Sequence, residues 1–282
     1  MVKIIECPRD AMQGIKPFIS TEIKAAYINQ LLTVGFDTID FGSFVSPKAI
    51  PQMKDTALVL EQLDLDQTSS KLLAIVANAR GARDAAQFEE IDYLGYPFSI
   101  SETFQMRNTN ATIEESLERV AQIQAIAAPS NKSIVLYISM GFGNPYGDPW
   151  NVEIVQYWVD RLQQMGIGIF QLSDTIGVAN PNNIAYLFQH LIGAYPNVEI
   201  GAHFHTVPSK WKEKVATAYQ FGCRRFDGAI KGYGGCPMAK DDLTGNMPTE
   251  NMIAYFQENN IDTGVDAALF LQSLQKAGEV FP

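Results

Sequence analysis

Short apolar runs recur along the chain, and most of the gaps between them carry the spacing of amphipathic helices. The runs predict eight strands, at residues 2–7, 38–44, 71–78, 91–100, 132–140, 167–175, 198–205 and 224–230. Helices are predicted near residues 21–35, 52–64, 80–89, 112–128, 150–165, 181–194, 209–221 and 249–259. Strand and helix therefore alternate along most of the sequence.

Several of the predicted helices begin at residues that cap helix N-termini. Ser20, Thr112 and Asn180 precede three of them, Thr112 begins a sequence with capping-box spacing, and Pro181 fits a first helical turn. Eight β-then-α units predict an α/β fold, a (β/α)₈ TIM barrel. An open doubly wound sheet is the alternative, but no G-x-G-x-x-G sequence follows the first strand.

Length and composition favour one large domain. The chain has 282 residues, of which 46% are hydrophobic, so it can bury a large core. We expect a single barrel domain over residues 1–282, with residues 261–282 as a C-terminal helical extension. No stretch approaches the roughly 18 apolar residues of a membrane span, and the first residues lack the apolar core of a signal peptide. We expect no association with a membrane.

The number of cysteines and the net charge indicate the cellular compartment and exclude one class of binding partner. Three cysteines are an odd number, which argues against a disulfide framework and predicts a reducing, cytoplasmic location. The net charge of −10 predicts no nucleic-acid partner, because binding to a phosphate backbone needs a basic surface. An anionic small substrate would need a locally positive pocket.

Two of the three histidines, His203 and His205, lie two residues apart at the end of the seventh apolar run. On a strand they point to the same face, so two imidazoles converge. A hydrogen-bonded pair packed at a strand end is one interpretation. The other is a metal site, because neutral imidazole is a common metal ligand.

The barrel hypothesis places chemistry at the C-terminal ends of the strands, where polar residues are found. Arg9 and Asp10 follow the first strand, Asp40 lies in the second, Asp174 ends the sixth, and a glycine-rich stretch, 231–246, follows the eighth. These strand ends would meet around one opening, together with the two histidines.

Asp10 with the two histidines would supply one oxygen and two nitrogen ligands, a set that suits Mg²⁺, Mn²⁺, Zn²⁺ or Fe²⁺. Each acidic or basic residue also has a simpler interpretation. Asp10 could form a turn or cap a helix, Arg9 could lie on the surface, and Asp174 could cap the next helix. Beside a metal, Arg9 is suited to clamping a carboxylate or stabilising an enolate.

Cys236 lies in the glycine-rich stretch and is followed by proline, unlike Cys7 and Cys223, which lie in or beside apolar segments and are expected to pack in the core. A cysteine over a barrel mouth can act as a general acid or nucleophile when its pKa is tuned. The alternative is an inert thiol in a turn.

Six segments together resemble a known family. They are ECPRDAMQ, SFVSPKAIPQM, SETFQMRNTNATIEES, LSDTIGVANP, AHFH and GYGGCPMA with GNMPTE, in this order between Cys7 and Glu250. They resemble 3-hydroxy-3-methylglutaryl-CoA lyase, one of the metal-dependent lyases related to isopropylmalate and homocitrate synthases. The resemblance covers nearly the whole chain.

The resemblance implies a barrel enzyme that cleaves 3-hydroxy-3-methylglutaryl-CoA, or a related 3-hydroxyacyl-CoA, to acetyl-CoA and acetoacetate with Mg²⁺ or Mn²⁺. It also implies that the enzyme is a homodimer. The metal ligands that it implies are Asp10, His203, His205 and Asn246. It implies that Arg9 stabilises the enolate, that Cys236 delivers a proton and that Asp174 helps to deprotonate the 3-hydroxyl. Asp40 and Glu250 would contact and orient the residues that bind metal and substrate, without binding either themselves.

The sequence departs from the family at four positions. Ala11 stands where the family has glycine, Asp40 where glutamate is usual, Thr206 where aspartate follows the histidines, and Asn144 where cysteine is common. The stretch after Thr206, VPSKWKEK, does not resemble the family. We therefore expect slower cleavage of 3-hydroxy-3-methylglutaryl-CoA or a related preferred substrate. An aldolase or synthase acting on a different hydroxy acid and a catalytically silent metal-binding barrel are the alternatives.

Overall fold

The computed structural model describes residues 1–235 and 244–281, and a closed barrel of parallel strands forms its centre. Within those residues, eight strands each pair in parallel with two neighbours, and β1 pairs with both β2 and β8. The strands are β1 (Lys3–Glu6), β2 (Thr38–Ser43), β3 (Lys71–Ile75), β4 (Tyr93–Ser99), β5 (Ser133–Ser139), β6 (Ile169–Asp174), β7 (Glu199–Thr206) and β8 (Arg225–Gly228). The predicted (β/α)₈ barrel is confirmed, because an open sheet would leave two edges unpaired.

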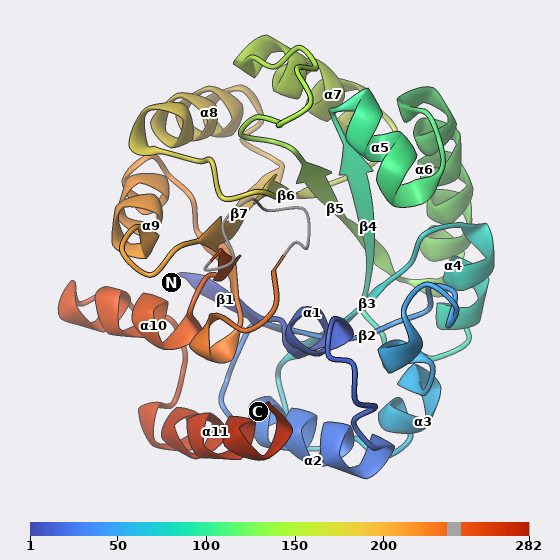
Figure 1. Cartoon of the computed structure of the whole chain (residues 1–282), viewed down its shortest axis with the longest axis vertical. Coiled ribbons are helices and arrows are strands. Elements are labelled where there is room, and N and C mark those ends of the chain that lie inside the picture. Colours follow the sequence, from blue (N-terminus) through green and yellow to red (C-terminus); the bar gives the residue numbers. More distant parts are fainter. Residues whose placement is uncertain (236–243, 282) are drawn as a thin grey trace.

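Helices form a ring around the barrel (Figure 1). They are α1 (Pro8–Gln13), α2 (Thr21–Leu32), α3 (Thr56–Leu60), α4 (Ala79–Ala85), α5 (Glu102–Thr109), α6 (Ile113–Ala127), α7 (Val152–Gln164), α8 (Pro181–Ala194), α9 (Trp211–Gln220), α10 (Thr249–Glu258) and α11 (Ala267–Val280). Short 3₁₀ helices occur at η1 (Pro51–Met53), η2 (Ala128–Ser130) and η3 (Ile230–Gly232). None of the helices in the described part of the chain is long and apolar enough to cross a membrane.

The predicted capping residues begin their helices as expected. The Ser20 hydroxyl accepts a hydrogen bond from the backbone N–H of Ile23. Thr112 and Glu115 form a reciprocal capping box at the start of α6, and Asn180 caps α8 immediately before Pro181. Each cap satisfies backbone donors that the helix leaves unpaired, so these starts are encoded locally.

Helix boundaries differ from the prediction in three places. The helix predicted at 52–64 is divided into η1 and α3, and the short helices α1 and α5 were not predicted. The helices α1 and α3 have six and five residues, which is too short for a hydrophobic period of 3.6 to be recognised. Helix α11 lies within the predicted C-terminal extension and packs against α2.

Two layers of apolar side chains hold the barrel together. The larger layer fills the space between the strands and the surrounding helices, and Ile4, Leu94 and Phe170 are among its fully buried members. A smaller cluster of alternate strand residues, including Leu73, Ile75 and Tyr137, forms a second group. Alternation along each strand sends successive side chains to opposite faces, so one strand contributes to both layers.

The mouth of the barrel is shaped by α1 and by a short return strand. Helix α1 directly follows β1 and lies beside the opening, next to β2 (Figure 1). Strand β9 (Gly245–Asn246) runs antiparallel to β7 and pairs His205 with Asn246. Two residues far apart in the sequence therefore become neighbours at the C-terminal end of the barrel.

Candidate functional site

Four residues predicted as metal ligands converge at the C-terminal mouth of the barrel. His203 and His205 project from the same face of β7, with their ring centroids 5.2 Å apart. One donor atom from each histidine and one from Asp10 lie within 4.8 Å of one another. The Asn246 side chain joins them by donating a hydrogen bond of 2.7 Å to Asp10 Oδ2.

Each histidine is oriented by a hydrogen bond from its Nδ1 atom. His205 Nδ1 lies 2.9 Å from the carbonyl oxygen of Thr175, and His203 Nδ1 lies 2.9 Å from Asp227 Oδ2. These bonds fix the ring orientations and leave each Nε2 atom available. Among the described residues, the buried His205 Nε2 has no hydrogen-bond partner. A buried nitrogen without a partner is costly, so this position fits a metal ligand.

The protonation states of Asp10 and His205 also fit a cation, whereas at His203 the hydrogen bond and charge of Asp227 outweigh burial and raise the pKa of the imidazole. Burial raises the pKa of Asp10, but the charges of Arg9, His203 and His205 outweigh it and keep that pKa below its ordinary value. Burial and the neighbouring His203 lower the pKa of His205, which favours neutral imidazole. The Asn246 amide nitrogen donates to Asp10 and to the carbonyl of Tyr233, so both of its N–H groups are used and only its amide oxygen could serve as a ligand. Two imidazoles and a carboxylate thus offer their ligand atoms near one point, beside this amide.

A second possible group, Cys7 with His203 and Asp227, also has its donor atoms within 4.8 Å. It suits a metal less well. Burial raises the pKa of the Cys7 thiol well above its usual value, so the thiolate is disfavoured. The Asp227 carboxylate is already occupied by His203 on one oxygen and by Gln171 on the other. The first group is therefore the metal-site candidate.

Arg9 is held rigidly beside Asp10 by a network of hydrogen bonds. Its guanidinium binds both oxygens of Asp40, with Nε 3.1 Å from Oδ1, and its Nη1 donates to Asp10 at 2.9 Å and to Gln13 at 3.1 Å. Burial raises the pKa of Asp40 to about 6, although Arg9 opposes this shift. These four bonds use four of the five guanidinium N–H groups and leave one for another partner.

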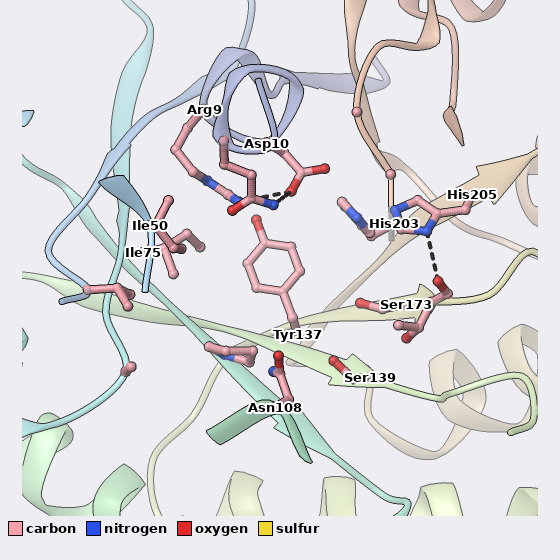
Figure 2. A pocket seen from close by; sticks show the side chains of 18 of the residues that line it. Arg9, Asp10, Ile50, Ile75, Asn108, Tyr137, Ser139, Ser173, His203 and His205 are labelled. Atoms are coloured by element: carbon pink, nitrogen blue, oxygen red, sulfur yellow. Dashed lines mark hydrogen bonds and ion pairs between the residues drawn. The ribbon is translucent and has the colours of Figure 1, made fainter. Parts of the chain in front are cut away.

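A cavity of about 770 Å³ opens in front of these residues. Figure 2 shows Tyr137 standing near its centre, with Arg9 and Asp10 on one side and the two histidines on another. One wall is apolar and includes Ile50 and Ile75, whereas the opposite part carries polar side chains. The polar lining residues include Asn108, Ser139, Ser173 and Thr175. A cavity that combines apolar surface with oriented polar and charged groups is typical of a small-molecule site.

The glycine-rich segment approaches the site closely. Gly234 has a φ of +85°, and a Cβ atom there would lie 2.7 Å from the carbonyl oxygen of Asp10 and 2.8 Å from the Asn246 amide. Only glycine fits such an approach without displacement. Gly234, Gly235 and Thr244 line the cavity. Cys236, the predicted proton donor, lies outside the described residues.

Asp174 and Glu250 occupy other positions. The buried Asp174 accepts hydrogen bonds from Lys214 Nζ at 2.6 Å and from the backbone N–H of Ala179 at 3.0 Å, and it does not line the cavity. Glu250 accepts from the backbone N–H of Lys231 at 2.9 Å, close to the start of the glycine-rich segment. The structure therefore brings neither of these carboxylates into the group around Asp10.

Three residues of the site were not found from the sequence. Asp227 orients His203 from the neighbouring strand. It is a charged residue within the eighth apolar run, which could have indicated a buried carboxylate. Gln13 donates to Asp10 at 2.6 Å, and its spacing of three residues along a helix could have indicated the contact. Tyr137 lies within an apolar strand and carried no such signal.

Comparison with known proteins supports one family. The model of the HMGL-like family matches residues 2–278. A hydroxymethylglutaryl-CoA lyase from Bacillus subtilis is 33% identical over 98% of this chain and 92% of its own length. A cytoplasmic 3-hydroxy-3-methylglutaryl-CoA lyase from Rattus norvegicus is also 33% identical, over 99% of this chain and 79% of its own length.

Solved structures give the same result. The crystal structure of HMG-CoA lyase from Bacillus subtilis has a TM-score of 0.92 and 33% identity, covering 99% of this chain and 93% of that one. An HMG-CoA lyase from Acinetobacter baumannii, solved with coenzyme A and 3-methylmalate, has a TM-score of 0.91 and 29% identity, covering 99% and 91%. The relatives include proteins named as cytoplasmic and as mitochondrial.

Proposed function

The chain belongs to the HMGL-like family of lyases, and from this premise we propose that it cleaves 3-hydroxy-3-methylglutaryl-CoA, or a related 3-hydroxyacyl-CoA, to acetyl-CoA and a ketone product. The product from 3-hydroxy-3-methylglutaryl-CoA would be acetoacetate. The observation that carries the proposal is the convergence of Asp10, His203, His205 and Asn246 on one cavity beside Arg9. These residues would hold Mg²⁺ or Mn²⁺.

An acyl-CoA substrate is supported by the charge around the cavity. The protein carries a net charge of −10, yet exposed cations lie within three residues of positions that line the cavity. These cations are Lys16, Lys48, Arg80 and Arg107. Cations close to the cavity would attract an anionic ligand by electrostatic steering even on an acidic protein. The phosphate groups of coenzyme A are such a ligand.

The chemistry needs removal of the 3-hydroxyl proton and stabilisation of negative charge on the departing thioester. A bound Mg²⁺ or Mn²⁺ would supply Lewis-acid polarisation of substrate oxygens. The remaining N–H group of Arg9 can donate to the enolate oxygen, and its other bonds keep the guanidinium fixed before the reaction begins. Cys236 would then protonate the enolate carbon to give acetyl-CoA.

The resemblance to the family implies that Asp174 helps to remove the hydroxyl proton. Its carboxylate is held by Lys214 and the backbone of Ala179 and does not line the cavity, so its contacts support a structural role instead.

The substitution His205→Ala tests the proposal, with His190→Ala as a matched control, because His190 is exposed on α8. We expect the His205 variant to lose Mn²⁺ binding and turnover of 3-hydroxy-3-methylglutaryl-CoA while keeping its circular dichroism spectrum. Parent protein that binds Mn²⁺ but turns over a different hydroxy acid would favour the aldolase or synthase alternative. Metal binding without any turnover would favour the silent barrel. Equal Mn²⁺ affinity in the His205 variant and the parent would contradict the assigned site.

A further inference from the structure

A fully buried lysine lies directly behind the metal-site candidate. Lys214 is on α9, and none of its surface is exposed. Its ammonium group donates to Asp174 Oδ2 at 2.6 Å, to the carbonyl oxygen of His205 at 2.7 Å and to the carbonyl oxygen of Gly177 at 3.2 Å. Three acceptors match the three N–H groups of an ammonium. Burying a charge is costly unless it is paired and hydrogen-bonded, and this group is both.

The three acceptors belong to the ends of two neighbouring strands. Asp174 ends β6, Gly177 lies in the turn after it, and His205 is near the end of β7. The ring of His205 is bonded to the carbonyl oxygen of Thr175, also at the end of β6. Lys214 therefore fixes the backbone of His205 to the same turn that fixes its imidazole.

Lys214 arises in the stretch of sequence that does not resemble the family. This stretch directly follows Thr206, which stands where the resemblance leads us to expect an aspartate. The Thr206 hydroxyl donates to the carbonyl oxygen of Val207 at 3.0 Å and does not line the cavity. In this chain the end of β7 is supported by Lys214 of α9 and by the pairing with β9.

We propose that Lys214 is a positioning residue for His205, which sets the orientation of the imidazole for metal binding by joining the ends of β6 and β7. The inference rests on the proposed metal site. It assigns to Asp174 the role of counter-ion to Lys214, facing α9 instead of the substrate. Loss of the lysine would leave the backbone of His205 and the β6–α8 turn linked only by the strand pairing that ends at Asp174 and Phe204 and by the His205–Thr175 bond.

The experiment uses the double variant D174N/K214M. Lys214→Met alone would leave the Asp174 carboxylate buried without its cation, which can prevent folding. The double variant removes both charges and keeps the aliphatic stem. Lys212→Met is the matched control, because Lys212 is on the same helix and its side chain is 61% exposed.

The first measurement needs no metal. The chain has three histidines, so the imidazole resonances can be followed by ¹⁵N-edited NMR in protein treated with EDTA. We expect the resonances of His205 to shift in D174N/K214M, those of the exposed His190 to stay, and all three to stay in K212M. Unchanged His205 resonances in the folded double variant would overturn the inference, whatever the metal does.

The second measurement is the dissociation constant for Mn²⁺, determined by electron paramagnetic resonance. Groups that orient a metal ligand typically contribute about 10–100-fold to metal affinity. We expect a loss of that size in D174N/K214M and none in K212M. A parent protein that binds no Mn²⁺ would contradict the proposed function. The NMR result would still show whether Lys214 positions the His205 imidazole. If the parent binds Mn²⁺ and the dissociation constant of the double variant is within twofold of the parent's, the positioning role is overturned and the proposed function is not.

Discussion

Glu6 should make the stability of the protein depend on pH. It lies on β1 with no surface exposed, and its carboxyl group accepts hydrogen bonds from the backbone N–H of Ile230 at 2.9 Å and from the Thr249 hydroxyl at 2.6 Å. Burial raises its pKa from 4.5 to about 8, against the opposing effect of these two bonds. The folded protein therefore holds this proton over a range in which the unfolded chain releases it.

The sign and size of the effect follow from linkage. Between pH 4.5 and about 8 the unfolded state binds fewer protons than the folded state, so the free energy of unfolding falls as pH rises. One unit of pKa difference corresponds to about 1.4 kcal/mol, so the loss is about 1.4 kcal/mol per pH unit and roughly 5 kcal/mol over the whole interval. The stabilising contribution of Glu6 is complete below pH 4.5 and is lost by about pH 8.

The variant Glu6→Gln isolates this contribution. Glutamine resembles the protonated glutamate, because its amide oxygen can accept from Ile230 while its amide nitrogen donates to Thr249. We expect the difference in unfolding free energy between parent and variant to change with pH by about 1.4 kcal/mol per unit. The measurement is urea unfolding at pH 5, 6, 7 and 8 with EDTA present. Glu118→Gln, at an exposed position on α6, is the control. Its unfolding free energy should change with pH in the same way as that of the parent. Parallel curves for the parent and the Glu6 variant would refute the reasoning.

Three further substitutions test the site itself. Asp227→Asn removes the charged partner of His203 Nδ1, so we expect Mn²⁺ affinity measured by calorimetry to fall by about 10–100-fold with little change in fold. Cys236→Ser raises the pKa of the proposed proton donor, so kcat should fall strongly in a steady-state assay while KM stays similar; an equal kcat would indicate an inert thiol. Asp40→Glu restores the residue usual in the family, but Asp40 already reaches Arg9 with both oxygens in a fully buried position. We therefore expect a loss of about 1–3 kcal/mol in urea unfolding from overpacking, and a tenfold rise in kcat/KM would show that the shorter carboxylate limits the reaction.

The local features of the fold were predictable because they depend on neighbouring residues. The apolar runs predicted the strands of the barrel, and the capping residues Ser20, Thr112 and Asn180 fixed three helix starts. Strand alternation correctly placed His203 and His205 on one face. The short helix α1 was missed because six residues are too few to show a helical period, although it carries Arg9 and Asp10.

Contacts between distant segments were decided by the tertiary structure. Closure of the barrel brings Asp227 beside His203 on adjacent strands, and the return strand β9 brings Asn246 beside His205. The resemblance to the family implied Asn246 as a ligand, but no property of the local sequence predicted either pairing.

The pairing of Asp174 with Lys214 shows the physical reason most clearly. The sequence determined that a carboxylate ends the sixth strand, next to a barrel mouth rich in polar residues. Whether that carboxylate faces a substrate or a buried ammonium depends on which residue of α9, 40 positions later, fits behind it. Such a choice is set by the packing of helices against the barrel and by the cost of leaving a buried charge unpaired, and both depend on distances that only the folded chain defines.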